Sequence, residues 1–357
     1  MSKAVPVICG TGLIALDVVV TPSTTNPPRF WAGGTCGNVL AILGFLGWKP
    51  VAVGRLETDP AGEFVSADLA RWHVDVRNLS LKPQCSTPII VEEISKNKAG
   101  LPRHRYLWTC PDCGAYLPTF RAIPIQTAHK LDSELSVPSV FFFDRVSPGI
   151  LTLARRFARE GSIIFFEPSA SGEPKHFQEA VRLAHVLKYS HQRVRGFVDL
   201  LAKSSPVLQI ETLGEDGLRF RTAAGNGQWT EMPSFDIPVV RDTAGSGDWC
   251  SAGIISQIGT LGPSGLAKIG RTDLNRALRY GQALAAWNCG FEGARGGMYR
   301  TTPMKFHQAI KKILGGVGVQ GGRTARRLHH TSASLQTMCP RCDIATNERR
   351  RPAAAAG

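Results

Sequence analysis

The segment Asp242-Thr-Ala-Gly-Ser-Gly-Asp248 combines residue types that suit work on an anion. Glycines let the backbone turn tightly and point successive N–H groups outward at the start of the apolar stretch Trp249 to Ile258, where a helix dipole favours negative charge. A carboxylate would repel that anion, so its natural task is to remove a proton from a hydroxyl that attacks phosphorus. Asp248 is therefore the predicted general base. The predicted anion hole is formed by Gly245, Ser246 and Gly247.

A purely structural interpretation of Asp248 is that it only caps the helix that follows. The complete seven-residue segment, placed after a strand expected at Asp236 to Val240, favours catalysis because context makes a short motif specific. The chain contains no G-x-x-x-x-G-K-[ST] sequence, which excludes a Walker-type nucleotide site. Phosphoryl transfer without a Walker loop is the chemistry that this segment predicts.

The same seven residues resemble the C-terminal signature D-T-x-G-A-G-D of the ribokinase family, also called the phosphofructokinase-B family of carbohydrate kinases. Ser246 stands where that signature has alanine. The family places its catalytic base at the last aspartate and its anion hole at the preceding glycines, so the resemblance implies the roles just given. It also implies ATP as the phosphoryl donor and Mg²⁺ as a cofactor.

Two segments of the N-terminal half extend the resemblance. In Gly10 to Asp17 an apolar strand ends in one carboxylate, and in Ala32 to Asn38 a glycine pair leads into an apolar helix. A carboxylate can accept two sugar hydroxyls, and paired glycines let a polyol lie against bare backbone. Taken singly, these residues also suit a turn, a plain loop and a helix start. The family uses the matching positions for substrate, which implies substrate contacts at Asp17, Gly33, Gly34 and Asn38.

The nucleotide is expected at Glu211 to Gly217, which is similar to the family's T-L-G-x-x-G. In the family this strand end and glycine turn run under the ATP phosphates and ribose, which implies ATP contacts at Thr212, Gly214 and Gly217. An ordinary hairpin turn is the alternative interpretation. Gly281 to Asn288 would lie near the adenine in such a fold.

The segment expected to help hold Mg²⁺ departs from the family. Members commonly carry N-x-x-E, whereas the corresponding place here is Ser190-His-Gln-Arg193, with neither the amide nor the carboxylate. Glu167 resembles a family position occupied by a carboxylate, and with ATP phosphates it would suffice for a hard cation that keeps several waters. Its alternative role is to cap Ser169 to Gly172. Arg193 is interpreted as an exposed arginine rather than a phosphate ligand.

The elements that must position these residues follow from periodicity. Short Val, Ile and Phe runs alternate with amphipathic stretches from residue 40 to about 315, which indicates an α/β fold. Asp59-Pro60 and Ser147-Pro148 each place a capping oxygen before a proline at the first helical position. A hairpin at an antiparallel edge is expected where Gly217 to Phe220 and Gln228 to Met232 flank the turn Ala224 to Gly227. Further strands are expected at Val5 to Cys9, Val51 to Gly54, Val140 to Asp144, Ile163 to Glu167, His185 to Lys188 and Val207 to Glu211.

The resemblance implies a ribokinase-like three-layer α/β/α sandwich over residues 4–314, with a small β lid from about 18–32 and 88–110. Closure of that lid over a sugar would exclude water, so that ATP is not hydrolysed. After Leu314 the apolar period ends, and residues 315–357 are expected to form a basic, largely disordered tail. Lid segments of the family often pair between subunits, which implies a homodimer by analogy.

Two C-x-x-C pairs, Cys110/Cys113 and Cys339/Cys342, have the spacing of zinc knuckles. The first pair lies in Lys96 to Pro124, a segment that breaks the α/β rhythm and is expected to be an insertion. The odd total of nine cysteines favours reduced thiols over a disulfide framework. Unligated surface thiols are the default interpretation, and a four-sulfur site is the alternative if the pairs meet in space.

Bulk composition limits the partners. The chain has 357 residues and a formal net charge of +14, which suits anionic ligands such as nucleotides. No apolar run approaches the ~18 residues of a membrane helix, and no signal-peptide cleavage pattern is present, so a cytoplasmic location without membrane contact is expected. The arginines of the tail lack interleaved aromatic residues, which disfavours nucleic-acid binding.

The resemblance therefore predicts an ATP-dependent kinase that phosphorylates a hydroxyl of a sugar or sugar-like molecule. A nucleoside kinase of the same family is one alternative, because Asp17 and the paired glycines suit any vicinal diol and Phe30 and Trp31 lie close in sequence. An idle kinase fold that senses a sugar or binds nucleic acid is another. The intact Asp248 and its glycines weigh against the idle fold.

Overall fold

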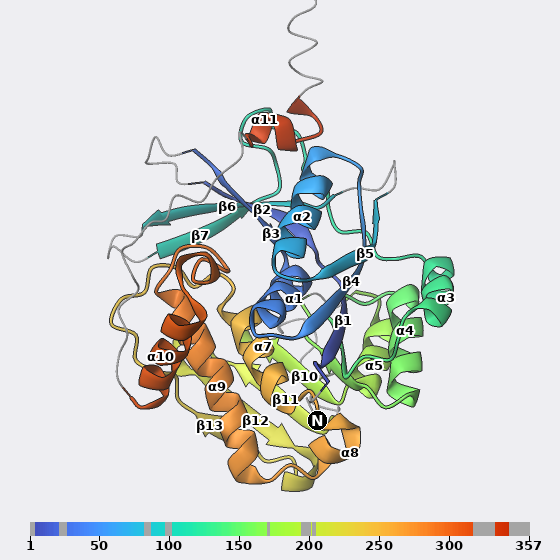
Figure 1. Ribbon diagram of the computed structural model, residues 1–357, viewed down its shortest axis with the longest axis vertical. Coiled ribbons are helices and arrows are strands. Elements are labelled where there is room, and N and C mark those ends of the chain that lie inside the picture. The colour runs from blue at the N-terminus through green and yellow to red at the C-terminus, as the bar shows by residue number, and fades with distance from the viewer. Residues whose placement is uncertain are drawn as a thin grey trace, which may run out of the picture.

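A nine-stranded sheet with the order β13-β12-β11-β10-β9-β8-β1-β4-β5 forms the centre of the molecule (Figure 1). The computed structural model describes residues 4–20, 27–81, 87–96, 102–169, 172–193, 201, 205–316 and 333–342. The strands are β1 (Val7–Thr11), β4 (Lys49–Leu56), β5 (Asp75–Leu81), β8 (Val140–Phe143), β9 (Ile163–Phe166), β10 (Val186–Ser190), β11 (Leu208–Thr212), β12 (Leu218–Thr222) and β13 (Thr230–Met232).

Neighbouring strands from β5 to β11 pair in parallel, whereas β11–β12 and β12–β13 pair antiparallel. The parallel strands predicted from their apolar runs are present, and the predicted hairpin forms the antiparallel edge. Its turn contains two successive left-handed residues, Asn226 at φ 54° and Gly227 at φ 68°, as tight hairpin turns often require. The carboxyl ends of β9, β10 and β11 therefore share one edge of the sheet.

Each face of this sheet buries its own core, because successive side chains of a strand point in opposite directions. On β8, Val140 and Phe142 belong to one buried cluster, and Phe141 and Phe143 to the other. The helices contributing to the second cluster are α3 (Ile125–Glu134), α4 (Pro148–Arg159) and α5 (Pro174–Leu183). Those contributing to the first are α1 (Thr35–Phe45), α2 (Pro60–Arg71), α7 (Ser246–Ile258), α8 (Gly262–Ala267), α9 (Arg271–Cys289), α10 (Pro303–Leu314) and α11 (Leu335–Met338). The predicted three-layer α/β/α sandwich is confirmed.

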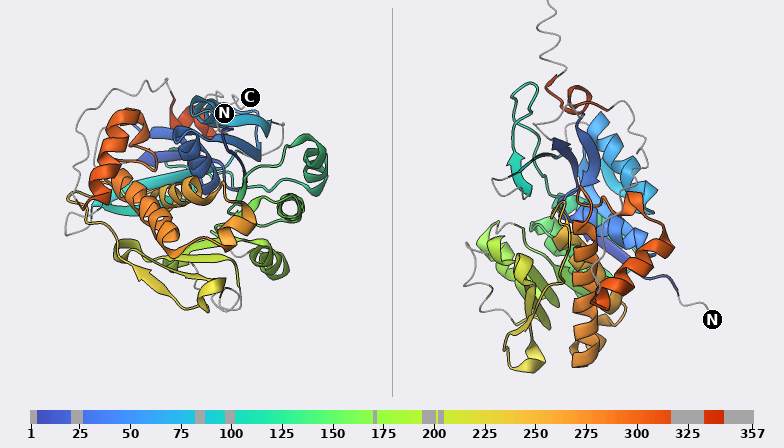
Figure 2. Two further views of the ribbon diagram at one scale, coloured as in Figure 1. Left: turned by 60° about the horizontal axis from the view of Figure 1, so that its bottom comes forward. Right: turned by 90° about the vertical axis from the view of Figure 1, so that its left-hand side faces the viewer.

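A second sheet of four strands has the order β3-β2-β6-β7. It consists of β2 (Ala15–Val20), β3 (Arg29–Gly33), β6 (Ile89–Lys96) and β7 (Pro102–Leu107), and it lies to one side of the large sheet (Figure 2). These strands overlap the segments 18–32 and 88–110 that the sequence assigns to a lid. That the sheet closes over a substrate stays a prediction.

The two predicted proline-led helix starts are confirmed. Asp59 accepts a hydrogen bond from the Gly62 backbone at 2.7 Å, and Ser147 accepts one from Ile150 at 3.3 Å. Each side chain satisfies an N–H group that the first helical turn leaves without a partner. Asp59 also accepts from the Thr87 hydroxyl at 3.0 Å, so its role is to fix α2 beside the second sheet.

Two expectations need correction. Asp236 to Val240 is not a strand: it has no paired neighbour among the described residues, and Val239 and Val240 are exposed. Its β-branched residues suit a strand, but pairing decides whether one forms. The tail is also not wholly without structure, because Leu335–Met338 form α11 and bury Leu335 and Met338. The remaining residues 317–332 and 343–357 lie outside the described residues.

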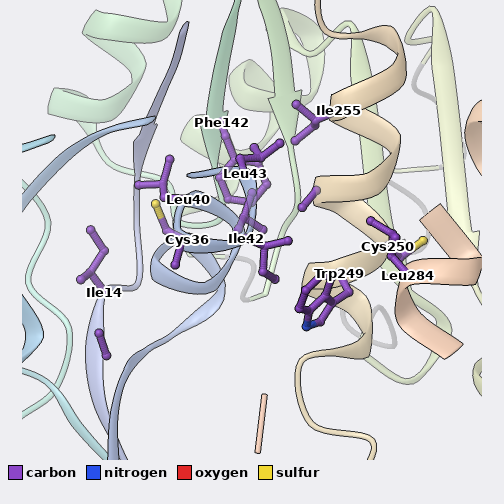
Figure 3. Packing of buried hydrophobic residues seen from close by; sticks show 14 of the residues in the cluster. Ile14, Cys36, Leu40, Ile42, Leu43, Phe142, Trp249, Cys250, Ile255 and Leu284 are labelled. Atoms are coloured by element: carbon purple, nitrogen blue, oxygen red, sulfur yellow. The ribbon is translucent and has the colours of Figure 1, made fainter. Parts of the chain in front are cut away.

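The layer beneath the predicted catalytic helix is tightly packed. Side chains from α1, α7 and β8 meet there, among them Leu43, Trp249 and Phe142 (Figure 3). Trp249 packs against Trp287 of α9, with ring centroids 5.2 Å apart. Because Trp249 directly follows Asp248, this packing fixes the start of α7. No helix in the described part of the chain is both long and apolar enough to cross a membrane.

Candidate active site

Asp248 lies in the first turn of α7 with its side chain buried. Asn38, on the facing helix α1, donates a hydrogen bond from Nδ2 to Asp248 Oδ2 at 2.8 Å. Burial raises the pKa of Asp248 to about 8, and the charge of Glu167 adds to this rise. The Asn38 bond and the positive charge of Lys188 act in the opposite direction. A carboxyl group that titrates near neutral pH suits proton transfer.

The loop before α7 is held in one conformation. Gly245 has φ 71°, and a Cβ there would lie 2.4 Å from the Ala294 carbonyl oxygen, so only glycine fits. The buried Asp242 carboxylate accepts from the backbone N–H groups of Ala244 at 2.8 Å and Gly293 at 2.7 Å. Asp242 thereby links the loop before α7 to Gly293, in the segment that follows α9.

The start of α7 is available to an anion. No side chain caps this helix among the residues that the structure describes, so the N–H groups of its first turn and the helix dipole face outward. Of the three predicted anion-hole residues, Ser246 already donates its backbone N–H to the Thr243 carbonyl at 3.2 Å. Gly247 follows it, and its carbonyl accepts from Lys188 Nζ at 3.2 Å. Gly245 and Gly247 therefore remain the stronger candidates.

A pocket lies between the second sheet and the loop after α9. Asp17 on β2 accepts from the Gly34 N–H at 3.4 Å, and a Cβ at Gly33 would lie 1.8 Å from Asp17 Oδ2. Gly33 thus permits the close approach of β3 to this carboxylate. Burial, followed by the charge of Glu92, raises the pKa of Asp17 to about 7. The lining consists of Asp17, Val19, Trp31, Ala32, Asn38, Glu92, Ala294 and Arg295.

Several buried polar atoms of this pocket have no hydrogen-bond partner within the described chain. They are Asp17 Oδ1, Asn38 Oδ1, and Nε and Nη1 of Arg295. Leaving such an atom unsatisfied costs about 1–3 kcal/mol, more when it is charged, so natural structures seldom retain them without a reason. Their common location makes this pocket a candidate binding site for a polar ligand.

Arg295 was not identified from the sequence. It is buried, donates to Asp68 Oδ2 at 2.9 Å, and also donates to the Ala32 carbonyl. Tyr299 donates to the same Asp68 oxygen at 3.0 Å. The only local signal is that Arg295 sits in the glycine-rich stretch Glu292 to Gly297 directly after a long helix. Its partners lie in distant segments, which no local pattern reveals.

A second polar cluster lies at the ends of β9 and β10. Lys188 Nζ donates to Glu167 Oε1 at 2.5 Å, and the Ser251 hydroxyl donates to Glu167 Oε2. Lys188 is 1% exposed. Both oxygens of Glu167 are thus bound and an ammonium group already balances its charge, so the residue does not fit the predicted role of Mg²⁺ ligand. Its described partners, Lys188 and Ser251, favour a structural role for this carboxylate. Residues 170–171 of the segment that it was alternatively expected to cap lie outside the described residues.

The segment corresponding to N-x-x-E is a strand end and a short 3₁₀ helix, His191–Arg193, whose side chains are exposed. His191 Nδ1 lies 2.7 Å from Oε1 of the buried Glu211, and Arg219 donates to the other Glu211 oxygen at 2.6 Å. Arg193 is exposed, as expected. Its charge also lowers the pKa of Asp248, so the residue stands near enough to act on the site electrostatically.

The predicted nucleotide turn follows β11 at the same sheet edge. Gly214 and Gly217 have φ 68° and φ 99°, and a Cβ at Gly217 would lie 2.3 Å from the Met232 carbonyl oxygen. Both glycines are therefore required by the backbone itself. The Thr212 hydroxyl donates to the Tyr189 carbonyl at 3.4 Å, a long contact. This geometry permits a bound phosphate chain, and the roles of the three residues in ATP binding stay predictions.

Comparison with known proteins decides the family resemblance. Residues 166–300 match the family described as pfkB family carbohydrate kinase, a stretch that runs from the last residue of β9 to beyond the end of α9 and includes Asp248. The resemblance to the pfkB family is confirmed. It carries with it the class of enzyme, a phosphotransferase with an alcohol group as acceptor.

Individual relatives agree with this resemblance to the pfkB family. A fructokinase from Klebsiella pneumoniae is 25% identical over 257 residues, which are 66% of this chain and 80% of the relative. Two solved structures share the fold. The fructokinase with bound ATP from Xylella fastidiosa is 17% identical with a TM-score of 0.66, covering 86% of this chain and 98% of its own. The aminoimidazole riboside kinase from Salmonella enterica is 20% identical with a TM-score of 0.62, covering 85% of this chain and 99% of its own.

The homodimer and the cytoplasmic location stay predictions.

Proposed function

We propose that this pfkB-like chain is an ATP-dependent kinase that phosphorylates a hydroxyl group of a sugar or sugar-like molecule. The observation that carries the proposal is the hydrogen bond from Asn38 to Asp248. It joins a residue of the pocket wall to the buried carboxylate at the start of α7. A hydroxyl bound in the pocket would therefore lie beside both the base and the anion-binding helix end.

The acceptor would be held by the polar atoms of the pocket. Asp17 Oδ1 and Asn38 Oδ1 can each accept from a hydroxyl, and Arg295 can donate from Nε and Nη1. Gly33 and Gly34 have no side chains, so only backbone lies beside Asp17 at these positions. Gly34 has a left-handed φ of 74°, a conformation that favours glycine. Satisfying several buried polar atoms at once favours a polyol over a molecule with one hydroxyl.

In the chemical step Asp248 accepts the proton of the acceptor hydroxyl as its oxygen bonds to the γ-phosphorus of ATP. The bond from that phosphorus to the leaving oxygen of ADP breaks in the same step. The start of α7, with Gly245 and Gly247, would stabilise charge on the transferring group. ATP as the donor is supported by the ATP-bound fructokinase of the same fold, and Thr212, Gly214 and Gly217 would lie beneath it. No protein ligand for Mg²⁺ is proposed, because Glu167 is fully engaged.

A nucleoside is the second candidate acceptor, and one observation favours it. Trp31 lines the pocket, and an aromatic ring can stack on a nucleobase while Asp17 holds the ribose diol. A solved nucleoside kinase from Burkholderia thailandensis in complex with inosine has the same fold, with a TM-score of 0.63. Replacing Trp31 by leucine distinguishes the two candidates. It should weaken binding of a nucleoside, whose base would lose its stacking partner, and should leave binding of a simple sugar largely unchanged.

The test is ADP release from ATP in the presence of Mg²⁺ across a panel of sugars, sugar acids and nucleosides. We expect turnover with one acceptor class, and a loss of at least about a hundredfold in Asp248→Asn, as removal of a general base predicts. Asp273→Asn, at an exposed position of α9, serves as the control and keeps wild-type turnover.

Failure would take a recognisable form. If the folded chain binds ATP but phosphorylates no acceptor, the proposal is wrong and the chain is an idle kinase fold. A salt-sensitive mobility shift with DNA in that case would support the nucleic-acid-binding alternative.

A further inference from the structure

The two C-x-x-C pairs meet in space although they lie far apart in the sequence. The Sγ atoms of Cys110 and Cys342 are 3.7 Å apart, and those of Cys113 and Cys339 are 3.8 Å apart. All four Sγ atoms lie within 4.8 Å of one another. Three of these side chains are at most 3% exposed, so the default interpretation of unligated surface thiols is wrong about their position.

The distances favour a metal over a disulfide. A disulfide requires sulfur atoms about 2.05 Å apart, and none of these cysteines is in one. Zinc bonds to thiolate at about 2.3 Å in a tetrahedron, which places the sulfur atoms about 3.8 Å from one another. The separations of Cys110 from Cys342 and of Cys113 from Cys339 match this edge length, and all four sulfur atoms lie within 4.8 Å of one another, so the cluster has the size of a four-thiolate zinc site.

The backbone of each pair is shaped to present two sulfur atoms to one point. Gly114 follows Cys113 at φ 73°, and its N–H donates to the Cys110 carbonyl at 2.8 Å. In the other pair the Cys342 N–H donates to the Cys339 carbonyl at 3.1 Å. These backbone hydrogen bonds fix the turn within each pair, and contacts of this kind hold metal ligands in position.

We propose that Cys110, Cys113, Cys339 and Cys342 bind one Zn²⁺ ion as four thiolates. Binding releases the four thiol protons and leaves a centre with a net charge of minus two. The protein fills all four positions of the tetrahedron, so no site for water or substrate remains open. The ion is therefore structural, unlike a catalytic zinc, which keeps one position free.

The proposed ion would tie the C-terminal segment to the loop that leaves the second sheet. Cys110 and Cys113 follow β7 directly, in a loop closed by the isolated pairing of Thr109 with Tyr116. Cys339 and Cys342 end the α11 segment, which lies beside α2 and the second sheet in both views (Figures 1 and 2). A helix of four residues such as α11 is not stable by itself and needs tertiary contacts. Its buried side chains Leu335 and Met338 anchor one side of it, and the ion would fix the other end to the loop after β7.

The first test is the metal content of the full-length chain, purified without a histidine tag and dialysed against metal-free buffer. We expect about one zinc per chain, released by a mercurial that modifies thiols. Cobalt added to the metal-free chain is expected to give the intense visible absorption and thiolate charge-transfer bands of a tetrahedral four-sulfur site. A chain without zinc whose cobalt form lacks these bands would overturn the proposal, as would bound iron or disulfides between the pairs in mass spectra.

Variants locate the site. The double variant Cys113→Ser/Cys339→Ser, which removes one ligand from each pair, is expected to lose zinc and to expose residues 333–342 to limited proteolysis. Cys289→Ser removes a buried cysteine elsewhere and keeps its zinc. Retention of zinc by the double variant would contradict the assignment. The measurements on the unaltered chain decide the question even if the double variant does not fold.

Discussion

Two buried polar clusters flank Asp248, and they differ in how far the protein satisfies them. In the pocket cluster, Asp17, Asn38 and Arg295 each retain polar atoms without a partner in the described chain. In the strand-end cluster, Lys188 and Ser251 saturate both oxygens of Glu167. Unsatisfied groups are tolerated where a ligand completes them, whereas saturated groups hold the scaffold. The comparison separates the residues that we propose bind the acceptor from those that we propose hold the scaffold, although both sets look equally functional in the sequence.

Lys188→Met should give the largest effect. It leaves the buried Glu167 carboxylate without its cation, which costs about 3–5 kcal/mol in comparable buried pairs. We expect a loss of that size in the free energy of unfolding, measured by urea denaturation. The double variant Glu167→Gln/Lys188→Met removes both charges and should recover most of it. Equal stability of Lys188→Met and the wild type would show that the strand-end cluster does not hold the scaffold.

Asp248→Asn should change activity and stability in opposite directions. The loss of the base lowers kcat by at least a hundredfold, equivalent to about 2.8 kcal/mol. The carboxyl group has a pKa raised from 3.8 to about 8, so the folded state binds its proton more tightly than the unfolded state does. Stability from this group falls as the pH rises from about 4 to 8. The variant should therefore unfold at higher urea than the wild type at pH 8, and at similar urea at pH 4.

Strands could be predicted from the sequence where they are buried on both faces, because such strands consist of a continuous run of apolar residues. All four residues of β8, Val140–Phe143, are buried, and such runs identify parallel strands between helices. The same rule failed at Asp236 to Val240, because apolar β-branched residues do not show whether a neighbouring strand exists. It also failed at α11, where Leu335 and Met338 find their core in distant segments.

Site residues could be predicted from the sequence where they belong to a recognisable motif. Asp248, Asn38 and Asp17 were expected in one site, and the structure brings them to one pocket and its edge. Arg295 and Lys188 were missed, since the meaning of a buried cation depends on which carboxylate lies beside it. Those contacts join residues more than 20 positions apart, and spacing along the chain carries no information about them.

Asp17→Asn should have a smaller effect that is confined to the acceptor. An amide keeps one acceptor oxygen but loses the charge, and hydrogen bonds to a charged group contribute about 1.5–3 kcal/mol. We expect KM for the acceptor to rise about tenfold or more, with kcat and KM for ATP changed much less. Stability should not fall, because the variant removes a buried carboxyl group. An equal rise in KM for ATP would mean that the pocket cluster shapes the whole site and does not bind the acceptor specifically.

The pH dependence of kcat/KM for the acceptor, at saturating ATP, should give the mildest but most specific effect. Asp248 must be ionised to accept a proton, and its pKa is about 8. Asp17 must be ionised to bind the acceptor fully, and its pKa is about 7. The rate should therefore level off above pH 8, fall tenfold per pH unit between 8 and 7, and fall more steeply below 7. In Asp17→Asn the steeper limb should disappear, because only Asp248 still titrates. A limb that stays steep in this variant would assign the second ionisation to another residue, and the pocket cluster would lose its charged member.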